Sequence, residues 1–224
     1  MYIRVPLATA ALLICTFTGA DAKKAAIDAQ LFAAYTASPD TVQFDVCGAT
    51  QNTSGCYGGG LMSPPFEQAC AVLEGTPKYK DNVVTRAIYV LDKRTSKTDP
   101  AMLYVYTRSD TITADSVSIE VTLKKQIPLD VTGGVKSHCF MVAGESFLYA
   151  ATDASTQVGV VDKKALTETP LHGSGLVTRL TADERGYVAV NFQGSFGIAS
   201  PEGGFVESGG GNEYEVSTRN AWLP

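Results

Sequence analysis

A strand–turn–strand unit at residues 147–171 constrains the possible folds of this sequence more than any other feature. It begins with the apolar, β-forming run FLYAAT at residues 147–152 and continues through turn-forming residues to a second apolar run at 158–162. The chain then returns through KKALTETPL at residues 163–171. Because a single hairpin cannot bury its own apolar face, further β-structure must cover it. The sequence therefore predicts an all-β fold.

Similar units precede and follow this one at a step of about 42 residues. The residues that mark the step are Leu103 with Leu148, Pro128 with Pro170, and Gly144 with Gly186. Each step has room for about four short strands, which is the signature of a β-propeller blade. We expect a small propeller-like array of about four or five blades. A β-sandwich, whose strands are also short and evenly spaced, is the alternative.

At the level of single blades, residues 147–166 and 180–204 resemble the repeats of secreted or periplasmic β-propeller proteins. In those repeats a strand ends in Asp or in a Pro-x-Gly turn before the next strand begins. The resemblance extends over residues 83–208 and implies a scaffold for recognition, because propellers serve many functions. It identifies no site residue.

The amino terminus has the pattern of a secretory signal peptide. Arg4 is followed by an apolar segment at residues 7–17 and by small residues at positions 20 and 22, so we expect residues 1–22 to be removed after Ala22. A lipoprotein signal ending at Cys15 is the alternative, although Ile14 stands where a small residue is usual. The apolar segment is well short of the roughly 20 residues that span a bilayer. We therefore expect a secreted or periplasmic protein that does not span a membrane.

Cysteine usage agrees with export. Cys15 lies in the predicted signal peptide, and four cysteines remain: Cys47, Cys56, Cys70 and Cys139. An even number of cysteines in an oxidising compartment indicates disulfides, and four cysteines allow three pairings. We favour Cys47 with Cys56, which would enclose a glycine-rich turn, and Cys70 with Cys139, which would tie the amino-terminal region to the repeats. We expect no metal site, because no C-x-x-C spacing is present.

Two regions outside the repeats lack the strand pattern of the repeats. Ile27, Leu31 and Tyr35 follow helical spacing, which predicts a short helix over residues 23–37 within an amino-terminal arm at 23–40. Residues 47–65 contain consecutive glycines and prolines and predict a long, disulfide-closed loop. Residues 41–224 form a single all-β domain in this interpretation, with a last strand at residues 214–217.

The sequence offers little catalytic chemistry. The net charge of −5 provides no basic field for nucleic acid, and the sequence contains no H-E-x-x-H, G-x-S-x-G or Walker motif. The two histidines, His138 and His172, lie in predicted loops, and Cys139 should be oxidised. Two pairs of neighbouring carboxylates lie in predicted turns, Asp110 with Asp115 and Asp183 with Glu184. We expect no cofactor and identify no catalytic residue.

These features favour an exported, disulfide-stabilised, non-catalytic binding or interaction module whose partner is a protein or a glycan. The alternative is a small secreted hydrolase that acts on carbohydrate through two loop carboxylates. A structural component of the cell envelope is a third hypothesis. Convergence of two carboxylates from different blades in one pocket would favour the hydrolase.

Overall fold

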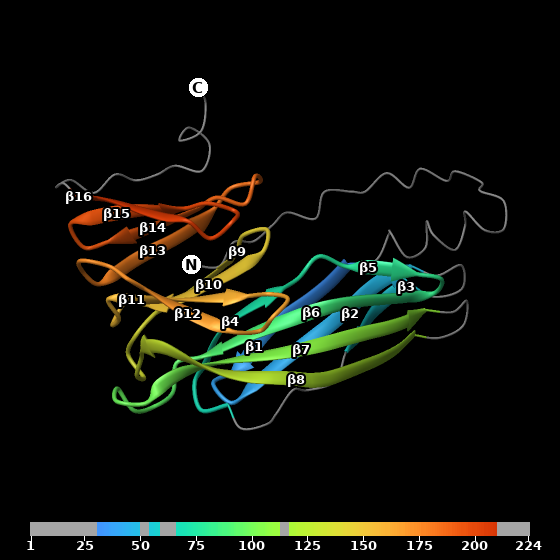
Figure 1. Cartoon of the computed structure of the whole chain (residues 1–224). Coiled ribbons are helices and arrows are strands. Elements are labelled where there is room, and N and C mark those ends of the chain that lie inside the picture. Colours follow the sequence, from blue (N-terminus) through green and yellow to red (C-terminus); the bar gives the residue numbers. More distant parts are fainter. Residues whose placement is uncertain (1–30, 50–53, 59–65, 113–116, 210–224) are drawn as a thin grey trace.

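The chain is described by a computed structural model over residues 31–49, 54–58, 66–112 and 117–209 (Figure 1). These residues form sixteen strands, β1–β16, in four antiparallel sheets. The described segments contain no helix that is long and apolar enough to cross a membrane. The predicted all-β fold class is confirmed.

Each sheet is built from strands that are close in sequence. Sheet A contains β1 (Leu31–Ser38), β2 (Thr41–Ala49) and β3 (Ser54–Gly58). Sheet B contains β4 (Ala69–Glu74), β5 (Lys78–Lys80), β6 (Val83–Asp92), β7 (Pro100–Ile112) and β8 (Val117–Thr132). Sheet C contains β9 (Cys139–Ala143), β10 (Phe147–Thr152), β11 (Gln157–Asp162) and β12 (Glu168–His172). Sheet D contains β13 (Val177–Ala182), β14 (Val188–Phe192), β15 (Ser195–Ala199) and β16 (Phe205–Gly209).

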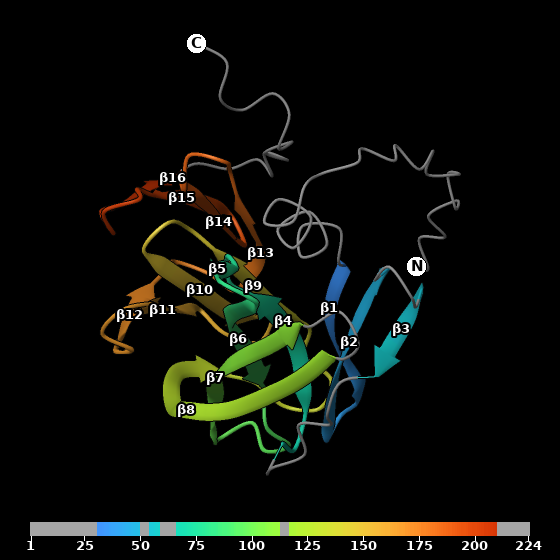
Figure 2. The ribbon, with the colours of Figure 1, turned by 90° about the vertical axis from the view of Figure 1, so that its right-hand side faces the viewer.

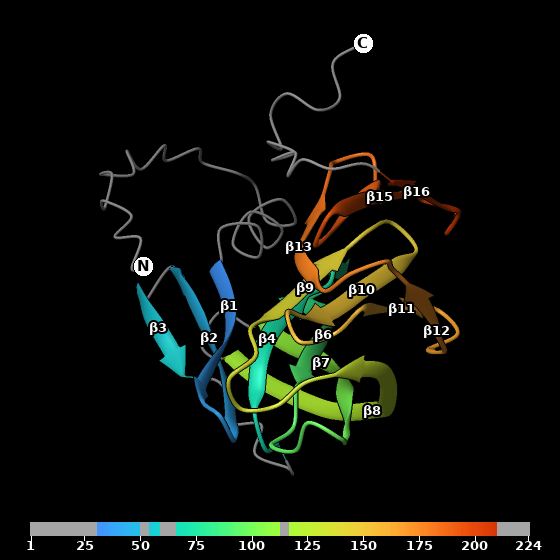
Figure 3. The ribbon, with the colours of Figure 1, turned by 90° about the vertical axis from the view of Figure 1, so that its left-hand side faces the viewer.

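The four sheets follow one another around an arc in chain order (Figures 2 and 3). The first strand of each sheet contacts the first strand of the next, β1 with β4, β4 with β9 and β9 with β13. Within the described residues, sheets A and D form the two ends of the series, and the arc does not close. A closed propeller is therefore not confirmed.

Three apolar layers hold neighbouring sheets together. The layer between sheets A and B contains Val42, Phe66, Ala69, Ile88, Val90, Tyr104 and Tyr106. The layer between sheets B and C contains Tyr89, Leu91, Ala101, Leu103, Val105, Ile127, Leu129, Val131, Leu148, Ala150 and Val161. The layer between sheets C and D contains Tyr149, Ala151, Val158, Val177, Leu180, Val188, Val190, Phe192 and Ala199. Neighbouring residues such as Val90 and Leu91 enter different layers because successive side chains of a strand point to opposite faces. Both faces of sheets B and C are therefore covered.

The repeat predicted from the sequence is correct in some of its positions. Residues 147–152 and 158–162 form β10 and most of β11, and sheets C and D have four consecutive strands each. Gly144 and Gly186 both lie in the turn between the first and second strands of a sheet, and a Cβ added at Gly144 would lie 3.0 Å from the Gly186 carbonyl oxygen. The two turns therefore pack closely against each other.

Of the other two residue pairs that mark the repeat, only one occupies equivalent strands of two sheets. Pro128 and Pro170 lie in β8 and β12, the last strands of their sheets. Leu103 lies in β7, the third strand along sheet B, whereas Leu148 lies in β10, the second strand of sheet C. The match between Leu103 and Leu148 was therefore wrong, because similar apolar dipeptides occur in more than one strand of a sheet.

The predicted amino-terminal helix is wrong where it can be compared. Residues 31–38 form β1, which pairs antiparallel with β2, for example Ala34 opposite Phe44. The run LFAAYTAS fits both helical and extended spacing, and the adjacent strand VQFDV supplies a pairing partner that a helix would leave unused. Residues 1–30, which include the predicted signal peptide, lie outside the described residues.

The predicted loop at residues 47–65 is also partly wrong. Residues 54–58 form β3, which pairs with β2 and places the backbone of Cys47 opposite that of Cys56. Their side chains lie outside the described structure, so this disulfide remains a prediction. The predicted last strand at residues 214–217 also lies outside the described residues.

Candidate functional site

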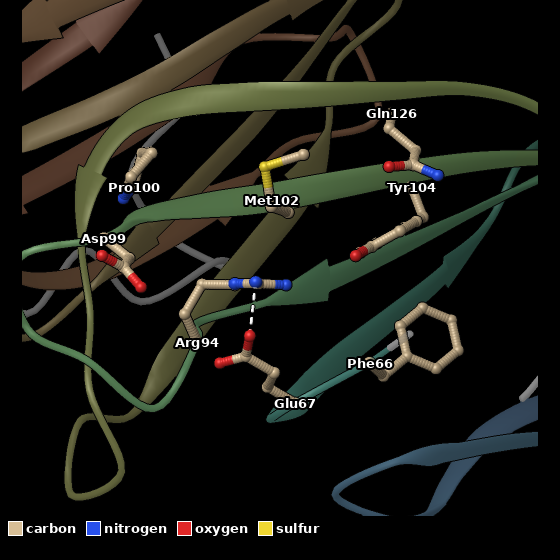
Figure 4. Close-up of a pocket in the computed structure, with 8 residues that line it drawn as sticks. All are labelled: Phe66, Glu67, Arg94, Asp99, Pro100, Met102, Tyr104 and Gln126. Carbon is tan, nitrogen blue, oxygen red and sulfur yellow. Dashed lines mark ion pairs between the residues drawn. The ribbon is translucent and has the colours of Figure 1, made fainter. Parts of the chain in front are cut away.

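A pocket with a volume of about 470 Å³ lies at one end of sheet B (Figure 4). Eight residues line it: Phe66, Glu67, Arg94, Asp99, Pro100, Met102, Tyr104 and Gln126. They come from the segment before β4, the connection between β6 and β7, β7 itself and β8. We call this site the Arg94 pocket.

The buried carboxylate of Asp92 holds two parts of the pocket together. Asp92 ends β6 and is fully buried. Its Oδ2 accepts the backbone N–H of Glu67 at 2.7 Å, and its Oδ1 accepts the N–H groups of Gln68 and Arg94, each at 2.9 Å. One side chain thereby joins residues separated by about 25 positions in the chain.

An ion pair joins two of the lining residues, Arg94 and Glu67 (Figure 4). Arg94 has a positive φ of 62°, a conformation that the surrounding hydrogen bonds must maintain. The backbone N–H and the hydroxyl of Thr95 donate to Oε2 of Glu67 at 3.2 and 2.9 Å. These hydrogen bonds, assisted by the charge of Arg94, hold the pKa of Glu67 below its usual value. Glu67 therefore remains ionised near neutral pH.

Packed aromatic side chains form the floor of the pocket. The rings of Phe66 and Tyr104 meet edge to face at a centroid distance of 4.9 Å, and both residues are buried. Burial and the charge of Asp92 raise the pKa of Tyr104, while a hydrogen bond with Arg94 opposes the rise. The phenol of Tyr104 therefore stays protonated and points toward the guanidinium (Figure 4).

Polar groups remain accessible around this floor. Asp99 and Gln126 are exposed, and the side chains of Arg94 and Glu67 retain 23% and 34% of their accessible surface. Gln126 lies opposite Tyr104 in the pairing of β7 with β8. Two carboxylates, one guanidinium and one amide thus surround a partly apolar floor, without a Ser, Cys or His among the lining residues. This arrangement suits hydrogen bonding to a ligand better than nucleophilic chemistry.

The cysteine predictions are confirmed in part. Cys70 and Cys139 form a disulfide between β4 and β9, with an S–S distance of 2.02 Å and a Cα–Cα distance of 5.9 Å.

The described residues contain no group of three or more His, Cys, Asp or Glu side chains that could hold a metal ion.

The predicted turn carboxylates lie in different environments. Asp183 accepts the backbone N–H groups of Arg185 and Tyr187 and stabilises the turn between β13 and β14, as predicted for a turn residue. Asp110 lies in β7, where it is fully buried and pairs with Arg108 at 2.8 Å, so its prediction as a turn residue was wrong. Asp115 lies outside the described residues.

The two histidines do not share a site. His138 Nδ1 lies 2.7 Å from Oδ2 of Asp153, before β9. His172, at the end of β12, contacts Gln157 through Nδ1 at 3.1 Å.

The sequence did not indicate the residues of the Arg94 pocket. Its key contacts join segments that are far apart in the chain through backbone hydrogen bonds to Asp92. The only local signal is Asp92 itself, an aspartate that directly follows the apolar run IYVL at residues 88–91.

Comparisons with known proteins do not assign a family. No family model matches the sequence, and no curated protein matches it significantly.

Proposed function

We propose that this protein is an exported, non-catalytic binding module that recognises hydroxyl-rich ligands, such as glycans, in the Arg94 pocket. In this proposal the four sheets form an open, propeller-like scaffold. The contacts between the first strands of successive sheets support such a scaffold, because blades of a propeller are arranged in this way.

The observation that carries the proposal is the combination of groups around the pocket. Carboxylate, guanidinium and amide groups all exchange hydrogen bonds with hydroxyls, and several of them converge on one cavity. The ion pair between Arg94 and Glu67 neutralises the only guanidinium of the lining. A neutral polyhydroxylated ligand therefore suits the pocket better than an anion.

A glycan array followed by titration calorimetry would test the proposal on protein recovered from the periplasm with its disulfides intact. We expect Gln126→Ala and Asp99→Ala each to weaken binding about 5- to 10-fold, as expected for the loss of one hydrogen bond. Lys164→Ala, an exposed position in sheet C between β11 and β12, is the matched control and should bind normally. An array without any bound glycan, or binding that both pocket variants retain, would contradict the proposal.

A hydrolase remains the second candidate because of one pair of carboxylates from different sheets. Oε1 of Glu168 in β12 accepts the backbone N–H of Asp130 in β8 at 2.9 Å, and Oδ2 of Asp130 accepts from Gln157 at 3.0 Å. Burial raises the pKa of Glu168, and the charge of Asp130 adds to the rise. A carboxyl group with a raised pKa is suited to general acid catalysis. Hydrolysis of chromogenic glycosides that Glu168→Gln abolishes would favour this function over the binding module.

A further inference from the structure

A second pocket lies at the junction of sheets C and D, away from the Arg94 pocket. It has a volume of about 590 Å³, within the range of small-molecule sites. Its lining residues are His138, Cys139, Phe140, Asp153, Leu176, Val177, Thr178 and Gln193. We call it the His138 pocket.

The side chain of His138 is 82% exposed, and Asp153 binds it on one side. Its Nδ1 lies 2.7 Å from Oδ2 of Asp153, and its backbone N–H donates to Oδ1 of the same carboxylate at 2.8 Å. The N–H of Asp153 in turn donates to the carbonyl of His138 at 3.1 Å. Because an ionised carboxylate only accepts hydrogen bonds, the Nδ1 atom must carry a hydrogen. The neutral ring then offers Nε2 as a hydrogen-bond acceptor.

The charge of Asp153 sets the electrostatics of this pocket. Burial alone would raise the pKa of Asp153, but hydrogen bonds from the side chain and backbone of His138 hold it below its usual value. Asp153 is therefore ionised near neutral pH. The lining contains no Lys or Arg, and the chain as a whole carries a net charge of −5. These charges disfavour an anionic ligand.

The remaining walls are apolar or neutral. Phe140 and Val177 belong to the apolar layer between sheets C and D, and Leu176 beside them is 40% exposed. Thr178 and Gln193 contribute neutral polar groups. A flat apolar ligand with one hydroxyl donor would match both the walls and the acceptor at His138.

We propose that the His138 pocket binds small aromatic alcohols, with the ligand hydroxyl donating to Nε2 of His138 and the aromatic ring lying against Phe140 and Leu176. Asp153 is a positioning residue in this site, since it fixes the tautomer and the orientation of the imidazole. The site is separate from the Arg94 pocket and does not depend on the function proposed for that pocket.

Titration of the full chain with p-cresol, followed by NMR of the histidine ring nitrogens, would test the proposal. We expect p-cresol to shift the His138 ring signals at pH 8. The methyl ether 4-methylanisole keeps the ring but lacks the donor, so it should bind about tenfold more weakly than p-cresol. His138→Gln should lower the affinity for p-cresol by a similar factor.

Controls separate this site from the rest of the protein. His172→Gln changes the other histidine and should leave p-cresol binding unchanged, as should Gln126→Ala in the Arg94 pocket. Asp153→Asn should weaken the binding of p-cresol and change the His138 ring-nitrogen signals toward a mixture of tautomers, because it removes the carboxylate that accepts from Nδ1. Tighter binding of 4-methylbenzoate than of p-cresol would identify an anion site and overturn the proposal. The absence of any shift at His138 with p-cresol would also overturn it.

Discussion

At the scale of single residues, sheet B contains a group of charges in its interior. Arg86 Nη1 lies 2.8 Å from Oε2 of Glu74, and Arg108 Nε lies 2.8 Å from Oδ1 of Asp110. A longer contact of 3.8 Å joins Arg108 to Glu74. Arg108 and Asp110 are fully buried, and burial raises the pKa of Asp110 despite the opposing effect of Arg108. Each charge in this group depends on its partner, because an isolated charge in the protein interior is very unfavourable.

This dependence predicts strong coupling between Arg108 and Asp110. Asp110→Ala leaves the Arg108 guanidinium buried beside fewer acceptors, so we expect a loss of about 3–5 kcal/mol in the free energy of unfolding. The double variant Arg108→Met, Asp110→Ala removes both charges and should be more stable than Asp110→Ala alone. Urea denaturation of Arg108→Met, Asp110→Ala and the double variant measures this coupling. Additive losses would show that the two side chains do not interact as the structure indicates.

At the scale of elements, the sequence predicted best those strands that are apolar and end at turn residues. The predicted strand at residues 147–152 coincides with β10. β7 and β8 include many polar residues, because polar residues of one strand, such as Arg108, pair with residues of the other across a long hairpin. Hydrophobic patterns cannot indicate where such polar pairing continues.

Hydrophobic patterns could not predict the candidate site. Glu67 and Arg94 meet because Asp92 binds the backbone of both segments, and this contact depends on the completed sheet. The disulfide between Cys70 and Cys139 could be predicted, since few pairings of four cysteines are possible. The helix predicted over residues 23–37 is wrong at residues 31–37, because pairing with β2 outweighed local spacing there.

The disulfide joins two elements of different sheets and should stabilise their contact. Cys70 in β4 and Cys139 in β9 are separated by 69 positions, and β4 contacts β9 directly. In the chain-entropy model, closing a loop of this length contributes about 4 kcal/mol. We expect the variant Cys70→Ala, Cys139→Ala to lose about this much free energy of unfolding, measured by urea denaturation. An unchanged denaturation midpoint would show that the bond does not constrain the unfolded chain.

At the scale of the whole molecule, the sheets differ in how many of their faces are covered. Sheets B and C lie between two apolar layers, and their central strands are therefore apolar without strict alternation. Within the described residues, sheet D packs on sheet C through one face only, and Val206 in β16 is 74% exposed. Stability should therefore decrease from the middle of the series toward sheet D, since contacts are made mainly between neighbouring sheets.

Native-state hydrogen exchange should reveal this gradient. We expect the backbone amides of β6, β7 and β10 to exchange most slowly, because their strands pair on both sides within sheets that are covered on both faces. Amides of β16, at the edge of sheet D, should exchange much faster and through local opening that leaves sheets B and C intact. The variant Leu180→Ala weakens the layer between sheets C and D, so it should accelerate exchange in β13–β16 more than in β6 and β7. Equal acceleration in all sheets would instead show that the series unfolds as one cooperative unit.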